Sequence, residues 1–160
     1  KQAPLIERIA AKYVKADNFF YIGRGYLYPT ALEGALKLKE ISYVHAEGYH
    51  AAELKHGSIA LLEENVPVVA MANAAPGQDK MIGNIRECLA RHAPVIAVVS
   101  GDDHTVDELT DDIIRVPMSS RYVAPLTTIV ALQLFAYYFA KFRDCPIDQP
   151  RNLAKSVTVE

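Results

Sequence analysis

Short, predominantly apolar runs alternate along this chain with longer segments whose apolar residues recur at helical spacing. Apolar runs of this length predict strands that are buried on both faces. They lie at residues 19–22, 66–71, 94–99 and 113–116. Buried strands separated by helices form a parallel sheet that is covered on both sides. The sequence therefore predicts an α/β fold, a three-layer αβα sandwich around a mainly parallel sheet of four to five strands. Ligands of such sheets are expected beyond the carboxyl ends of the strands.

The segments between these runs are expected to be mainly helical. Apolar spacing predicts a helix from Pro29 to about His45, and proline is well suited to the first turn of a helix. Further helices are predicted at residues 5–14, 58–62, 79–91 and 124–143. Residues 47–57 are expected to form an irregular connection, and the polar residues after the last helix an irregular C-terminal tail.

Composition excludes several classes of protein. A chain of 160 residues supports one domain with a core of its own. A formal net charge of −2 argues against a nucleic-acid partner, which calls for a basic surface. Polar residues interrupt the most apolar stretch, residues 123–142, so no membrane span is expected. Cys88 and Cys145 are far apart in the sequence, which indicates a reduced, cytoplasmic protein, and Cys88 is expected to lie in the core.

Three charged residues of the helix that begins at Pro29 share one face. Glu33, Lys37 and Glu40 stand at positions i, i+4 and i+7. Spacing alone leaves two interpretations open. One is a solvated ion-pair face. The other is an acid/base cluster, in which a lysine beside two carboxylates sets protonation states for proton transfer.

Histidines and carboxylates gather in the connection that follows this helix. His45, His50 and His56 lie close in sequence to Glu47 and Glu53. Their spacing matches no zinc pattern, so no metal is expected. His56 precedes a glycine and a short helix, where it is either a catalytic imidazole or an ordinary loop histidine.

Two loops carry weaker signals. The turn Gly23-Arg24-Gly25 follows a predicted strand and precedes a helix, which favours a tight turn and permits a weak anion site. The acidic residues between Asp102 and Asp112 are expected to face solvent.

Four segments together resemble the isomerase domain of the glucosamine-6-phosphate synthase family. They are Gly23-Arg24-Gly25 with Tyr28-Pro29, residues 31–43 (ALEGALKLKEISY), residues 53–57 (ELKHG) and residues 148–160 (DQPRNLAKSVTVE). The second and third are shared more loosely by other sugar-isomerase (SIS) domains, whereas the tail is more specific. The resemblance implies a flavodoxin-like SIS domain over residues 1–147, equivalent to the second SIS lobe of the family, and an active-site tail over residues 148–160.

The resemblance also implies roles for individual residues. Glu40 corresponds to the base that moves a proton between C1 and C2 of the sugar, and Lys37 to the neighbour that assists it. His56 corresponds to the residue that opens the sugar ring. In the family this histidine reaches into the partner subunit's site, which implies a homodimer.

The tail and the start of the same helix are implied to contact the substrate. Lys155 corresponds to the tail lysine that forms a Schiff base with the open-chain ketose, an amine chemistry that lysine supplies once it is deprotonated. Ala154 and Glu33 are the implied substrate-binding residues beside it.

The implied activity is that of a glutamine–fructose-6-phosphate transaminase (isomerizing). It makes glucosamine 6-phosphate from fructose 6-phosphate and glutamine-derived ammonia for amino-sugar synthesis, and it needs no cofactor. Position 1 is Lys rather than the family's nucleophilic cysteine, and the Ser/Thr-rich phosphate loop is not visible. The isolated chain is therefore expected to be inactive, with the first SIS lobe and the glutaminase domain as its partners.

Three alternatives remain beside this interpretation. The first is a non-catalytic SIS domain that binds a sugar phosphate for regulation. The second is another SIS enzyme, such as a sugar-phosphate isomerase or a deglycating deaminase. The third is a folded half-domain that serves as a scaffold for dimerisation. The combination of Glu40, Lys37, His56 and Lys155 with the tail motif favours the synthase.

Overall fold

A parallel sheet of five strands forms the centre of the molecule. The computed structural model describes residues 2–73 and 77–153. The strands lie in the order β2-β1-β3-β4-β5, and each pairs in parallel with its neighbours. Their bounds are Asn18–Gly23 (β1), His45–His50 (β2), Val68–Met71 (β3), Val95–Ser100 (β4) and Ile113–Val116 (β5). The predicted parallel α/β sheet is confirmed.

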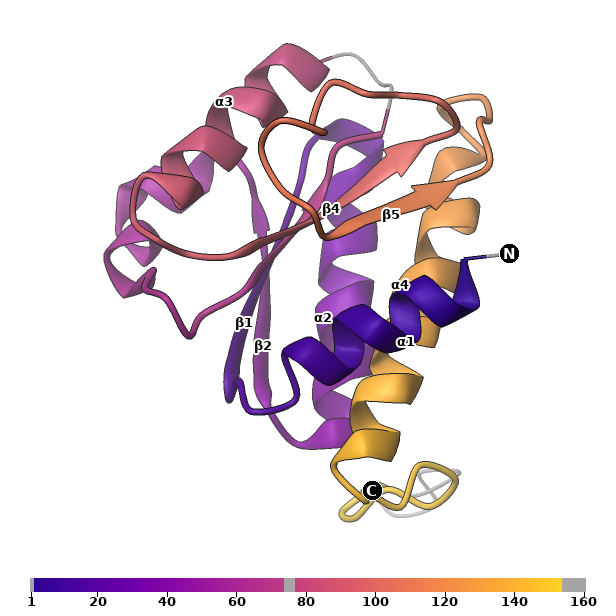
Figure 1. Cartoon of the computed structure of the whole chain (residues 1–160). Helices are drawn as coiled ribbons and strands as arrows, with labels where there is room; N and C mark the ends of the chain where they lie inside the picture. The colour runs from indigo at the N-terminus through magenta and orange to yellow at the C-terminus, as the bar shows by residue number, and fades with distance from the viewer. Residues whose placement is uncertain (1, 74–76, 154–160) are drawn as a thin grey trace, which may run out of the picture.

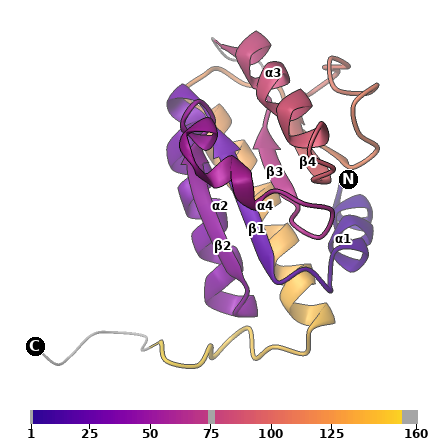
Figure 2. The ribbon, with the colours of Figure 1, turned by 90° about the vertical axis from the view of Figure 1, so that its left-hand side faces the viewer.

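Helices cover both faces of this sheet, as Figures 1 and 2 show. One face carries α1 (Ala3–Lys12), α2 (Tyr28–Ser42) and α4 (Ala124–Phe142). The other carries α3 (Gln78–Leu89) and two short 3-10 helices, η2 (Glu53–His56) and η3 (Ser58–Leu61). A third, η1 (Gly25–Leu27), connects β1 to α2. Within the described ranges, none of the helices is long and apolar enough to cross a membrane.

Successive side chains of the buried strands point to opposite faces of the sheet, so the core has two halves. In β1, Phe19 and Tyr21 pack under α2 and α4, whereas Phe20 and Ile22 face the α3 layer. The ring of Phe19 lies edge-on to Phe139, with centroids 5.2 Å apart. Every residue of β1 after Asn18 is buried, which explains why so short a run reads as continuously apolar.

The first edge strand is the main difference from the expected elements. The helix predicted to reach His45 ends at Ser42, because Tyr43 adopts a left-handed conformation with φ 62° and donates its N–H to Lys39. Strand β2 then follows at the start of the expected irregular connection. It pairs with β1 from Asn18↔His45 to Gly23↔His50. As an edge strand of sequence HAEGYH it has no apolar run, so periodicity missed it.

Two glycines let α2 lie close to its neighbours. A Cβ on Gly34 would lie 2.6 Å from Leu132 Cδ1 and 3.0 Å from the Tyr21 ring. A Cβ on Gly48 of β2 would lie 2.8 Å from Leu32 Cα. Both contacts are shorter than ordinary carbon–carbon packing, so any larger side chain forces the elements apart. These positions fix the placement of α2 against the sheet.

The acidic loop faces solvent only in part. Asp102, Asp107 and Asp111 are exposed, but Asp112 is buried at the start of β5. Its Oδ2 accepts hydrogen bonds from Tyr13 Oη (2.5 Å) and Lys12 Nζ (2.6 Å). The expectation of a wholly solvated loop is therefore wrong for Asp112, because this carboxylate anchors the end of α1.

Candidate active site

The face of α2 predicted from spacing carries a real ion-pair cluster. Lys37 Nζ lies 2.7 Å from Glu40 Oε2 and 3.6 Å from Glu33 Oε1. The three side chains are half-buried, because they stand at the border between the inward residues of α2 and its outward face. The structure therefore brings Glu33, Lys37 and Glu40 together.

The two glutamates of this cluster raise the pKa of Lys37. The hydrogen bond to Glu40 raises the pKa of Lys37, partial burial opposes that rise, and the charges of Glu40 and Glu33 add to it. Lys37 is therefore an ammonium at neutral pH, and it donates a hydrogen bond rather than accepting a proton. A carboxylate paired with a fixed ammonium suits proton abstraction, because the cation stabilises negative charge that develops on the substrate. Of these three side chains, only the two glutamates can therefore accept a proton at neutral pH.

The cluster lies away from the carboxyl ends of the strands. Glu40 stands in the last turn of α2, and the chain then enters the amino end of β2 beside Asn18 of β1. These three residues belong to the side of a helix rather than to the strand–helix loops, and a ligand beyond the carboxyl ends of the strands stays a prediction. The exposed side chains of Leu32 and Leu36 flank the cluster. The cluster and these two leucines thus form one partly exposed face of α2.

His56 lies in the opposite layer. It ends η2 and is exposed, while its neighbour Lys55 holds η2 against α3 through a 2.6 Å ion pair with Glu87. The hydrogen bond from Lys55 lowers the pKa of Glu87. Among the described residues, no hydrogen bond or ion pair joins His56 to the cluster on α2. A single chain does not bring His56 and Glu40 into contact.

The other two histidines of this region are His50, which has contacts within the fold, and His45, which is exposed. His50 Nδ1 accepts the Ala52 N–H at 3.3 Å, and its ring lies edge-on to Tyr28 at 5.6 Å between centroids. His45 is an exposed residue at the start of β2. In residues 2–73 and 77–153 no three His, Cys, Asp or Glu side chains are arranged to hold a metal ion.

The turn Gly23-Arg24-Gly25 is tight. A Cβ on Gly23 would lie 2.2 Å from the Leu27 carbonyl oxygen, and Gly25 has φ 52°. The Arg24 guanidinium is bound to Asn84 Oδ1, at 3.1 Å from Nε and 2.8 Å from its terminal nitrogen. The space between this turn and Asn73 is no larger than a water molecule. The described residues therefore form no cavity of phosphate size beside this turn.

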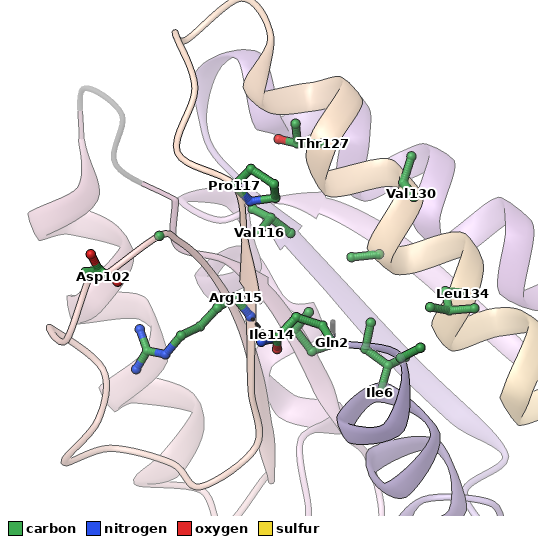
Figure 3. A pocket seen from close by; sticks show the side chains of 13 residues that line it. Gln2, Ile6, Asp102, Ile114, Arg115, Val116, Pro117, Thr127, Val130 and Leu134 are labelled. Carbon is green, nitrogen blue, oxygen red and sulfur yellow. Dashed lines mark hydrogen bonds between the residues drawn. The ribbon is translucent and has the colours of Figure 1, made fainter.

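A larger groove lies between α1, β5 and α4, as Figure 3 shows. It encloses about 600 Å³ and is lined mainly by apolar side chains such as Ile6, Val130 and Leu134. Arg115, the one cation among the described residues that line it, is paired with Asp107 at 2.6 Å. Of the predicted catalytic residues that the structure describes, which are Lys37, Glu40 and His56, none lines the groove. No local pattern predicts this groove, because its walls come from residues 2–6 and 101–134, which are far apart in the sequence.

The root of the tail rests on the end of α2. The Arg151 N–H donates to Tyr43 Oη at 2.9 Å, and the Arg151 guanidinium lies 4.2 Å from the Tyr43 ring centroid. No sequence pattern connects these two positions. Ala154 and Lys155, predicted to contact and bind the substrate, lie outside the described residues.

Comparison with known proteins identifies the family of the chain. The model of the SIS domain family matches residues 12–141. Glutamine–fructose-6-phosphate aminotransferase (isomerizing) from Chlorobaculum tepidum is 52% identical over 160 residues, and that from Methanosarcina acetivorans is 55% identical over 159 residues. These alignments cover 100% and 99% of the chain but only 26% of each relative. The chain thus spans about a quarter of the length of these curated relatives.

Solved structures place the fold in the same group. The C-terminal domain of glucosamine-fructose-6-phosphate aminotransferase from Francisella tularensis has a TM-score of 0.85 at 36% identity, covering 93% of this chain and 42% of that one. A Clostridium novyi protein described as a tagatose-6-phosphate ketose/aldose isomerase also has a TM-score of 0.85, covering 100% of this chain and 44% of that one. Its 15% identity shows the fold alone. The family match covers most of the sheet and both helical layers, and the chain therefore belongs to the SIS domain family.

Proposed function

We propose that this chain is the second SIS lobe and C-terminal tail of a glutamine–fructose-6-phosphate aminotransferase (isomerizing). In this proposal the whole enzyme makes glucosamine 6-phosphate from fructose 6-phosphate and glutamine-derived ammonia. The observation that carries the proposal is the 2.7 Å pair of Lys37 and Glu40 on α2, in a chain that aligns from end to end with relatives of that name. Residues 1–147 form the SIS lobe and residues 148–160 the active-site tail. Cys88 and Cys145 are free thiols, which fits a cytoplasmic enzyme.

Glu40 is the proposed base of the isomerisation. In the imine of fructose 6-phosphate the C=N bond is at C2, so Glu40 removes a proton from C1 and a proton is returned to C2. Lys37 donates to Glu40 and stabilises the negative charge that forms between these steps. Glu33 lies on the same face and is proposed to contact the substrate.

The remaining roles belong to segments that lie apart from α2 in a single chain. Lys155 is proposed to form the first imine with C2 of the open-chain ketose, with loss of water. Ammonia then displaces the Lys155 amine from C2, so the imine that is isomerised carries the ammonia nitrogen and the lysine is released. Ala154 is proposed to lie beside the substrate. His56 is proposed to open the sugar ring in the site of a partner subunit, which fits its exposure and its distance in the fold from the cluster. A homodimer follows from this role. Sedimentation of the chain at micromolar concentration should show a dimer, and a clean monomer would count against it.

The substrate's phosphate needs an anchor that the described residues do not show. The described residues beside the Gly23-Arg24-Gly25 turn form no cavity of phosphate size, and the proposed anchor is the first SIS lobe of the full-length enzyme. The outward faces of α2 and α4 carry exposed apolar side chains that fit a covered surface: Leu32, Leu36, Leu126, Val130 and Tyr137. The relatives extend well beyond the aligned region, which supplies the chain that would cover this surface.

Substitution of the base tests the proposal. In the full-length enzyme, Glu40→Gln keeps the shape of the side chain and removes its basicity, which should lower turnover on the order of 10²–10⁴-fold. The affinity for fructose 6-phosphate should change much less, and exchange of the C1 proton with solvent should fall in parallel. Glu63→Gln, at an exposed position far from α2, is the matched control. Near-normal exchange in Glu40→Gln would assign the base to another residue.

The separate chain provides a second test. Supplied with fructose 6-phosphate and a high concentration of ammonium, the 160-residue chain should form no product, because ammonium replaces the glutaminase but not the phosphate anchor. Addition of the first lobe should restore weak activity. Robust turnover by the chain alone would place the phosphate site within it.

A further inference from the structure

The groove between α1, β5 and α4 lies where the described chain begins. Gln2 and Ala3 line it together with Ile114 of β5 and Val130 of α4. Figure 3 shows Gln2 and Ile6 between the side chains of β5 and those of α4. The enclosed volume of about 600 Å³ is typical of a specific binding cavity. The start of the chain therefore forms part of the wall of this groove.

An apolar surface of α4 borders the groove and extends beyond it. The inward side of α4 packs into the core through residues such as Leu132 and Phe135. On the outward side, Leu126 and Val130 are 64% and 62% exposed. A helix that carries apolar side chains both inward and outward is usually buried on both sides. The groove and the outward side of α4 thus have the character of a surface that further polypeptide covers.

The start of α1 is fixed in this wall. Gln2 Oε1 accepts the backbone N–H of Arg115 in β5 at 3.3 Å. Gln2 is also the N-cap residue of α1, and its carbonyl oxygen accepts the Ile6 N–H at 2.9 Å. Both bonds hold the first described residue between the helix and the edge strand. The chain consequently enters the fold at the groove.

The proposed function supplies polypeptide at this point. The chain accounts for 26% of the length of the Chlorobaculum tepidum relative and for 42% of the solved C-terminal domain. If it is the second lobe, most of the remaining polypeptide precedes Lys1. Consecutive Cα atoms are 3.8 Å apart, so the residue before Lys1 has its Cα within about 7.6 Å of the Gln2 Cα, whatever path the chain takes. The preceding segment must therefore begin beside the groove.

We infer that the groove between α1, β5 and α4 is the seat of the segment that immediately precedes this chain in the full-length enzyme. This inference rests on the proposed function, which places the first SIS lobe before Lys1. The segment presents apolar side chains to Ile6, Val130 and Leu134. Because it leads from the first lobe, its docking fixes that lobe, and with it the proposed phosphate anchor, relative to the sheet.

Carbene footprinting measures whether the groove is covered. A photoactivated diazirine should label Val130 and Leu134 in the 160-residue chain, and this labelling should be largely lost in the full-length enzyme. Leu61, which is 62% exposed on η3 in the opposite layer, reports covering elsewhere. Equal labelling of Val130 in both proteins would overturn the inference.

A chain of intermediate length identifies what covers the groove. It carries only the preceding segment of about 20 residues, which would span about 30 Å as a helix. This extended chain should show the same protection of Val130 and Leu134 as the full-length enzyme. Protection that requires the whole first lobe would assign the groove to the surface of that lobe and refute the seat.

Substitution of Val130 tests the contact energetically. Because Val130 is exposed in the chain alone, Val130→Asp should lower the melting temperature of the 160-residue chain by no more than about 2 °C. In the extended chain the carboxylate would be buried among apolar side chains, so the loss should be several times larger. If that variant does not fold, Val130→Ser gives the same comparison. Gln133→Asp, at an exposed position of α4 that does not line the groove, is the matched control. Equal losses in the two variants would contradict the inference.

Two further outcomes separate this inference from its alternatives. A dimer of the 160-residue chain that Val130→Asp dissociates would place a second copy in the groove and overturn the inference. A full-length enzyme that makes no glucosamine 6-phosphate would refute the proposed function. The footprint of the extended chain would still decide whether the preceding segment fills the groove.

Discussion

Replacement of Gly34 by alanine tests how closely α2 is packed against the sheet that positions Lys37 and Glu40. The added Cβ would lie 2.6 Å from Leu132 Cδ1 and 3.0 Å from the Tyr21 ring. Ordinary carbon–carbon contacts are about 3.5–4.0 Å, so something must move by about 1 Å. Leu132 and Tyr21 are both fully buried, which leaves neither of them free space into which to turn.

The expected cost follows from two opposing effects. Overpacking of a core costs about 1–3 kcal/mol, whereas alanine in place of glycine within a helix gains about 1 kcal/mol. Gly34→Ala should therefore destabilise the fold by about 1 kcal/mol. Gly83 in α3 is the matched control, because a Cβ there meets nothing within 4 Å. Gly83→Ala should stabilise the fold by about 1 kcal/mol through helix propensity alone.

Urea unfolding followed by circular dichroism measures both variants. Their free energies of unfolding should differ by about 2 kcal/mol, and for a chain of this size their melting temperatures by about 4–8 °C. If Gly34→Ala is stabilised as much as Gly83→Ala, then α2 does not lie as close to Leu132 and Tyr21 as described. The close placement of α2, and with it that of the acid/base cluster, would then be refuted.

Three further predictions concern individual side chains. Glu40→Gln should lower the pKa of Lys37 toward the ordinary lysine value, as observed by NMR titration, because the hydrogen bond to Glu40 is the main cause of its rise. The raised pKa of Lys37 contributes stability that is fully present below the ordinary lysine pKa of 10.5 and is lost as pH rises through the folded-state pKa. The destabilisation caused by Glu40→Gln should therefore shrink in strong alkali. A difference in unfolding free energy between wild type and Glu40→Gln that stays constant into strong alkali would exclude this linkage. Tyr13→Phe removes a donor to the buried carboxylate of Asp112 and should cost about 2 kcal/mol in urea unfolding, whereas an unchanged midpoint would mean that this contact contributes nothing. Borohydride reduction of the full-length enzyme with fructose 6-phosphate should add a sugar-phosphate mass to Lys155, and labelling only elsewhere would leave that lysine an electrostatic role.

Local patterns were sufficient for the buried strands and the long helices. The runs around Phe19–Ile22 and residues 94–99 are apolar on both faces because both faces are covered, and that burial is visible in the sequence itself. Helical spacing likewise placed Glu33, Lys37 and Glu40 on one face, and the structure confirms their contact. Spacing did not distinguish a solvated ion-pair face from a catalytic one, because both have the same periodicity.

The elements that were missed depend on neighbours distant in sequence. Strand β2 exists because β1 offers it a ladder from Asn18 to Gly23, and its own residues carry no strand pattern. Asp112 looked like one more solvated acid, but the fold places Tyr13 and Lys12 against it.

The sequence by itself determined the fold class, the charged face of α2 and the tail motif that resembles the synthase family. Only the tertiary structure decided which of these parts meet. Two independent facts show this: His56 lies in the opposite layer from Glu40, and Arg151 binds Tyr43 across 108 positions. Periodicity reports how each residue relates to its own helix or strand. Contacts between elements depend on how the sheet orders them, and that order is set by packing of the whole chain.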